Sequence, residues 1–136
     1  MYRSLLFLVL LLPAVCNAEL VISDAWIKNL PPAVPVRAAY MTLHNSSTKA
    51  LRIVALRSAS FARVEIHETV MQDGMMRMQQ VPELRLNPGQ GVQLAPGGLH
   101  LMLIEPTRPT RPGEMHTIEI EYDDGSRQSL QIVVKK

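Results

Sequence analysis

The sequence predicts a single all-β domain, built as a β-sandwich or a Greek-key barrel. Ten prolines and seven glycines divide its 136 residues into short segments. Helical periodicity is scarce in these segments, whereas several of them alternate apolar and polar residues with the period of two that strands show. A chain of this length forms one domain, and its segments lie too close together for crossover helices between them.

The first eighteen residues are expected to be a secretory leader that is not part of the domain. Residues 1–18 carry one early charge, Arg3, followed by an unbroken apolar run and small residues. The run is shorter than the roughly 20 apolar residues that span a bilayer. We therefore expect cleavage after Ala18, export to the periplasm and no stable membrane insertion. Val15 precedes Cys16 where lipoprotein leaders carry a small residue, which disfavours lipid anchoring at Cys16.

Cleavage would remove the single cysteine and with it several kinds of chemistry. Removing 18 of the 136 residues leaves 118, none of which is cysteine. Disulfides, thiolate nucleophiles, zinc–thiolate sites and iron–sulfur clusters are thereby excluded from the mature chain. The net charge of +2, without a cluster of Lys or Arg, argues against a nucleic-acid surface. No Ser–His–Asp order, carboxylate pair or phosphate-binding loop indicates an enzyme.

The sequence predicts eight to ten short strands, and turn residues separate the five candidate strands of the first half of the domain. A proline-rich loop at 31–35 divides the first two strands, and the Asn-Ser-Ser turn at 45–47 divides the second from the third. A short connection at 58–62 precedes the fourth strand, and the Asp-Gly turn at 73–74 leads into the fifth. These strands are 20–28, 37–44, 50–57, 63–69 and 75–81.

Five further strands are expected in the second half. The Asn-Pro-Gly turn at 87–89 divides two very short strands, and the Pro-Gly-Gly turn at 96–98 introduces a longer one. A proline-rich loop at 106–112 follows, and the last two strands form a hairpin around Asp-Asp-Gly at 123–125. These strands are 84–86, 92–94, 99–105, 115–122 and 127–134.

The alternation within three of these strands turns chemically distinctive side chains away from the core. Three leucines of the strand at 99–105 alternate with His100 and Met102. The leucines are therefore expected to face the core, and His100 and Met102 to point outward on the other face. The same alternation turns His67 outward and places Met76 and Met78 on a shared face.

Imidazole and thioether groups on one patch indicate a metal site, and their softness selects copper. A thioether is a poor ligand for zinc, calcium or magnesium, whereas Met together with His suits copper, above all Cu(I). Taken singly, a methionine more often fills a gap in a core. Seven of the eight methionines remain after cleavage, and five lie in or beside the patch: Met71, Met75, Met76, Met78 and Met102.

The spacing of four of these residues resembles a known metal-binding signature. The pattern H-x10-M-x21-H-x-M is formed by His67, Met78, His100 and Met102. It resembles the signature of the PCu(A)C family, the periplasmic copper chaperones that serve the CuA centre of cytochrome c oxidase. The resemblance covers nearly the whole mature chain, through DAWIK at 24–28, AAYMTLHN at 38–45, VEIHET at 64–69, DGMMRM at 73–78 and PGGLHLML at 96–103.

This resemblance implies a cupredoxin-like β-barrel over residues 19–136 that binds one Cu(I) through His67, Met78, His100 and Met102. It further implies a monomeric metallochaperone, not an enzyme, that passes copper to the apo CuA subunit of the oxidase or to a thiol-containing copper chaperone. A blue-copper electron carrier, the obvious rival on this fold, needs a cysteine thiolate that the mature chain lacks.

Several alternatives stay open from the sequence. The same site would serve a copper-scavenging or tolerance protein, and a Met-rich patch would also suit a purely structural or adhesion domain. Glu65 and Glu68 flank His67 and are interpreted as a solvated strand face, with orientation of the His67 ring as the alternative. Met71, Met75 and Met76 are candidates for auxiliary ligands or a relay, with packing as the alternative. Met115 and His116 are a further candidate copper contact, but a pair without other ligands beside it is expected to be a surface pair.

Overall fold

The computed structural model describes residues 19–136, and the expected leader with Cys16 lies outside these residues. Every expected strand is present, and β1, β6 and β9 have the expected bounds. The largest difference is in β4, which is longer than predicted at both ends. Within residues 19–136, no helix is long and apolar enough to cross a membrane. The strands are β1 Leu20–Lys28, β2 Val36–Asn45, β3 Leu51–Ser58, β4 Phe61–Gln72, β5 Met75–Gln80, β6 Leu84–Leu86, β7 Gly91–Leu94, β8 Leu99–Pro106, β9 Met115–Tyr122 and β10 Arg127–Lys135.

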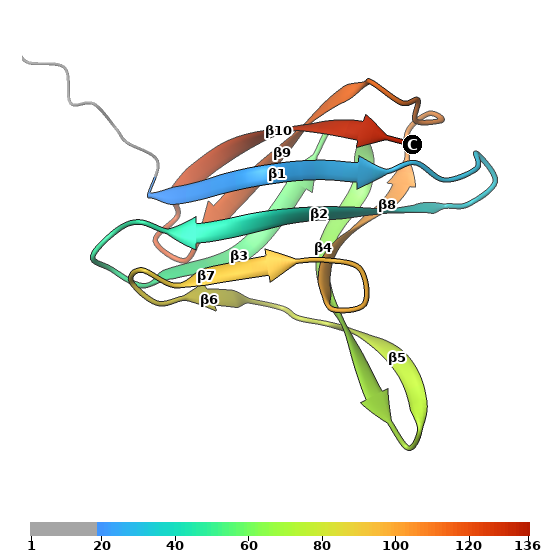
Figure 1. The fold of residues 1–136 in the computed structure, drawn as a ribbon. Helices are drawn as coiled ribbons and strands as arrows, with labels where there is room; N and C mark the ends of the chain where they lie inside the picture. Colours follow the sequence, from blue (N-terminus) through green and yellow to red (C-terminus); the bar gives the residue numbers. More distant parts are fainter. Residues whose placement is uncertain (1–18) are drawn as a thin grey trace, which may run out of the picture.

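Seven of these strands close into a barrel (Figure 1). Hydrogen bonds connect them in the order β4-β8-β2-β1-β10-β9-β3, and β3 returns to β4 through the pairs Leu56–Val64 and Ser58–Phe61. The β1–β10 pair is parallel, and the other pairs of the ring are antiparallel. The three short strands β5, β6 and β7 attach to β4, β3 and β2. The predicted all-β barrel is confirmed.

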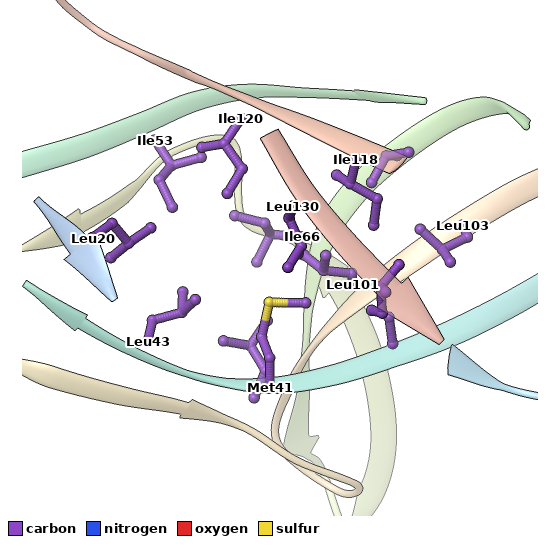
Figure 2. Packing of buried hydrophobic residues seen from close by; sticks show 14 of the residues in the cluster. Leu20, Met41, Leu43, Ile53, Ile66, Leu101, Leu103, Ile118, Ile120 and Leu130 are labelled. Carbon is purple, nitrogen blue, oxygen red and sulfur yellow. The ribbon is translucent and has the colours of Figure 1, made fainter. Parts of the chain in front are cut away.

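The barrel encloses an apolar core, which Figure 2 shows at its centre. Alternate residues of the seven barrel strands supply most of it, as the period-two patterns predict. Ile66 of β4 and both Leu101 and Leu103 of β8 are at most 4% exposed. Met41 of β2 is buried among them, so this methionine has the gap-filling role that Met often has in cores. The inner faces of β4 and β8 are therefore committed to packing, and their chemistry lies on the outer faces.

A hairpin made by the end of β4 and all of β5 projects from the barrel (Figure 1). Its two-residue turn has positive φ at both central positions, 53° at Asp73 and 73° at Gly74. These values correspond to a type I′ turn, which favours Asp-Gly because a residue with a Cβ is strained at the second position. All six residues of β5 are exposed. The hairpin therefore extends the sheet beyond the part that the core holds in place.

Candidate metal centre

The pairing of β4 with β8 places two histidines side by side on the outside of the barrel. His67 and His100 are directly opposite each other in the antiparallel register. Their ring centroids are 6.2 Å apart, and the ring planes are inclined by 38°. They are 33 positions apart along the chain, so the pairing of β4 with β8 is what brings these two imidazoles together.

Two methionines complete the cluster from the flanking register positions. Met102 is opposite Glu65 on β4, and Met78 of β5 is opposite Thr69. Each methionine is thus a diagonal neighbour of His67, at the roughly 7–8 Å that long side chains can bridge. By alternation, both share the outer face with the two imidazoles, while Ile66 and Leu101 occupy the inner face. All four expected ligands therefore lie on one face of the β5-β4-β8 sheet.

His100 is buried, although its side chain points away from the core. It is 4% exposed, because β8 lies between β2 and β4 and its outward side chains have neighbours on both sides. Its Nδ1 lies 2.9 Å from the carbonyl oxygen of Gly98, to which it donates in the neutral ring. Its Nε2 is one of two buried side-chain nitrogen or oxygen atoms in residues 19–136 that lack a hydrogen-bond partner. The other belongs to Arg37, whose guanidinium makes three further hydrogen bonds.

The unpartnered nitrogen fits a metal ligand. A buried polar atom without a partner costs roughly 1–3 kcal/mol, so native structures rarely keep one. The Nδ1–H bond to Gly98 fixes the tautomer and leaves the lone pair of His100 on Nε2. A fixed ring with its lone pair free is how proteins present histidine to a metal ion.

His67 is oriented by a carboxylate on its own strand. Its Nε2 lies 2.8 Å from a carboxylate oxygen of Glu65, two residues away on the same face. The other oxygen of Glu65 lies 3.5 Å from the guanidinium of Arg63. The interpretation of Glu65 as a solvated residue is therefore wrong, since this carboxylate is largely covered and holds the ring. Period-two alternation carried the signal for this contact, because residues 65 and 67 share a face.

The donor set of this cluster is soft and nearly neutral. It offers two imidazoles and two thioethers, and one carboxylate, that of Glu65, contacts the His67 ring. In the described part of the chain, no group of three or more His, Cys, Asp or Glu residues could hold a metal ion.

The auxiliary methionines divide between two faces of the hairpin. Met71 is opposite Met76, so both lie on the face that carries Met78. Met75 is opposite Gln72 and lies on the other face. Glu68 also lies on that other face, where its carboxylate accepts a hydrogen bond from Gln79 at 3.5 Å. Of the three auxiliary candidates on the hairpin, Met71 and Met76 thus continue the cluster, and Met75 does not.

Met115 and His116 are not part of this cluster. They lie on β9, which pairs with β3 and β10 instead of β4 or β8. Met115 is 56% exposed, whereas His116 is 7% exposed, so adjacent side chains face opposite ways. The expectation of a surface pair is wrong for His116, whose nitrogens lie 2.9 Å from the Ser60 hydroxyl and 3.2 Å from the Glu114 carboxylate.

Comparison with known proteins places the chain in a family. A family model described as "Putative lipoprotein LpqE-like" matches residues 20–134. The chain belongs to the LpqE-like family. "Putative lipoprotein Lxx21020" of Leifsonia xyli subsp. xyli is 29% identical over 115 residues, covering 84% of this chain and 68% of that protein. An uncharacterized protein of Rickettsia prowazekii, RP573, is 29% identical over 107 residues, covering 78% of this chain and 59% of that protein.

Solved structures share the fold of this LpqE-like protein. The copper-bound PCuAC domain from PmoF2 superposes with a TM-score of 0.72 at 19% identity, over 87% of this chain and 93% of that one. The Cu(I) form of DR1885 from Deinococcus radiodurans has a TM-score of 0.68 at 30% identity, over 82% of this chain and 75% of that one. The predicted relationship to the PCu(A)C family and its barrel is confirmed.

Proposed function

We propose that this LpqE-like protein binds one Cu(I) through His67, Met78, His100 and Met102 and carries it outside the cytoplasm. The observation that carries the proposal is the buried Nε2 of His100, which has no partner among residues 19–136 and lies on the face shared with His67 and two thioethers. Further support comes from the Cu(I) carried by the DR1885 relative and the copper in the PmoF2 domain.

The donor chemistry selects the oxidation state of the cargo. Thioether sulfur is soft and uncharged, and imidazole is neutral as a ligand, so none of the four groups supplies the anionic charge that supports Cu(II). Zinc, calcium and magnesium bind thioethers poorly for the same reason. Cu(I) is therefore the ion that gains most from this set of ligands.

The position of the cluster suits transfer better than storage. Met78 is 62% exposed, whereas His100 on the other side of the cluster is 4% exposed. An incoming ligand can therefore replace Met78 first, while the imidazole of His100 still holds the ion. Thiolates are softer than imidazole and carry charge, so a dithiolate acceptor should take Cu(I) from this site. We propose that the acceptor is the apo CuA subunit of cytochrome c oxidase or a thiol-containing copper chaperone.

Two experiments test binding and delivery separately. Chelator competition should show one tightly bound Cu(I), weakened about tenfold or more in Met78→Leu and unchanged in the matched exposed control Met75→Leu. The copper-loaded protein is then mixed with a reduced apo CuA domain, the two are separated, and copper is measured in each. If copper stays on this protein while a chelator of matched affinity removes it, the scavenging function replaces delivery.

The cellular location is part of the proposal. We propose export to the periplasm through the leader at residues 1–18, with cleavage after Ala18. The names of the family and of the Leifsonia relative include the word lipoprotein, which supports a place in the cell envelope. The intact mass of the exported protein tests cleavage, since a chain beginning at Glu19 supports the free form and a lipid on Cys16 contradicts it.

A further inference from the structure

The projecting hairpin continues the metal-binding face past the barrel. Met71 and Met76 are directly opposite each other in the register, and Met78 follows two residues after Met76 on the same strand. All three side chains lie on the face that carries His67, and a row of thioethers thus leads from the cluster towards the turn at Asp73.

These methionines are unusually exposed for apolar side chains. Met71, near the end of β4, is 67% exposed. Met76 and Met78 are 67% and 62% exposed and lie on β5, where every residue is exposed. Full burial of a methionine stabilises a fold by roughly 1.5–3 kcal/mol, and these three forgo most of that gain. Packing therefore gives no reason for methionine at these positions.

Their spacing allows the three sulfur atoms to meet at one ion. Directly opposed residues of an antiparallel pair have Cβ atoms about 4.5–5.5 Å apart, and diagonal neighbours are within reach of long side chains. Methionine has three rotatable bonds and adapts to such a site. The charged residues of the hairpin strands, Glu68 and Arg77, lie on the opposite face by alternation.

We infer that Met71, Met76 and Met78 form a second, outer Cu(I) site through which the metal enters and leaves the inner cluster. The inference rests on the proposed copper-carrier function and adds the path that the cargo takes. Met78 is shared by both sites, so the ion passes between them by exchanging one neutral ligand at a time, without redox chemistry. The outer site holds Cu(I) more weakly, because it lacks imidazole and is open to water.

Silver(I), a soft monovalent stand-in for Cu(I), tests the inference on the full mature protein labelled with ¹³C at the methionine methyl groups. The first equivalent should shift the methyl signals of Met78 and Met102. Silver beyond one equivalent should bind Met71 and Met76 while Met78 stays on the first ion. It should therefore shift the methyl signals of Met71 and Met76, while the exposed methyls of Met75 and Met115 keep their positions. The double variant Met71→Leu/Met76→Leu should keep the first equivalent, lose the second, and release Cu(I) to a chelator more slowly than wild type. Met75→Leu should match wild type in all three respects.

The outcomes separate this inference from the function on which it rests. If the first equivalent leaves Met78 and Met102 unshifted, the inner site fails, and the outer site fails with it. If the first equivalent behaves as expected but excess silver shifts Met71 and Met76 no more than Met75, the outer site alone is overturned. Release from the double variant as fast as from Met75→Leu overturns it equally. An unchanged spectrum of the core methyl of Met41 shows that each variant is folded.

Discussion

Two buried histidines of this domain differ in what their ring nitrogens contact. His100 and His116 are 4% and 7% exposed, and both lie on strands of the barrel. His116 has a partner at each nitrogen, Ser60 at Nδ1 and Glu114 at Nε2. His100 has Gly98 at Nδ1, but its Nε2 has none within the described chain.

Burial therefore does not distinguish the proposed ligand from the structural histidine, whereas the hydrogen bonds of the two rings do. His116 links the β3–β4 turn to the start of β9 and packs against Phe61 in a tilted arrangement, with ring centroids 5.5 Å apart. Every polar atom of that ring is used by the fold. The free nitrogen of His100 has no such use, and a metal ion would satisfy it.

The largest expected effect is on Cu(I) affinity when each of the two histidines is replaced by alanine. His100→Ala should weaken Cu(I) binding by roughly 100-fold or more, above the range for residues that merely orient a ligand. His116→Ala should leave Cu(I) affinity unchanged. Chelator competition on both variants measures this, and equal losses of affinity would remove the distinction between the two residues.

Stability should show the reverse order. His116→Ala removes a buried ring together with its contacts to the Ser60 hydroxyl and the Glu114 carboxylate, so the free energy of unfolding should fall. His100→Ala removes a nitrogen that is already unpartnered, so the metal-free protein should lose less. Urea unfolding of the two metal-free variants makes the comparison, and a more destabilised His100→Ala would identify His100 as a structural residue.

A smaller effect is expected from the carboxylate that orients His67. Glu65→Gln weakens the hydrogen bond to the ring, and Cu(I) affinity should fall about tenfold, the low end for outer-shell partners. Glu68→Gln, on the opposite face, is the matched control and should bind as wild type does. An unchanged affinity in Glu65→Gln would mean that the contact with His67 does not support metal binding.

The smallest expected effect is on how Tm falls in acid, and it comes from Glu114, the carboxylate that contacts His116. Burial raises the pKa of Glu114, but hydrogen bonds from Arg108, the Arg111 backbone and His116 outweigh it and hold this pKa below its ordinary value of 4.5. A lowered folded-state pKa adds stability above the unfolded-state value, and this stability is lost as pH falls through the folded-state pKa. Glu114→Gln should therefore flatten the decline of Tm in acid. If Tm falls equally steeply in wild type and in Glu114→Gln, the lowered pKa of Glu114 does not contribute to stability.

The two histidines also show which features of the fold and the site can be predicted from the sequence and which cannot. Turn residues such as Asp73-Gly74 and the leucine alternation of β8 are local signals, and they predicted the strands and the outward direction of His67 and His100. Which strands become neighbours is decided by barrel closure, which no local pattern encodes. The burial of His100 between β2 and β4, and the contact of His116 with Ser60, 56 positions away, depend on that closure. The side-chain pattern therefore predicted which way each side chain points, whereas only the structure shows which residues it contacts.

Absorption spectroscopy at the copper K-edge tests the central claim most directly, because it reports the oxidation state and the ligand atoms of the bound ion. For the Cu(I)-loaded protein, the proposed set of His67, Met78, His100 and Met102 predicts a Cu(I) edge with both nitrogen and sulfur scatterers in the first shell. Replacing His100 by alanine should reduce the nitrogen contribution, whereas His116→Ala should leave the spectrum unchanged. A first shell of nitrogen and oxygen alone would contradict the proposed centre.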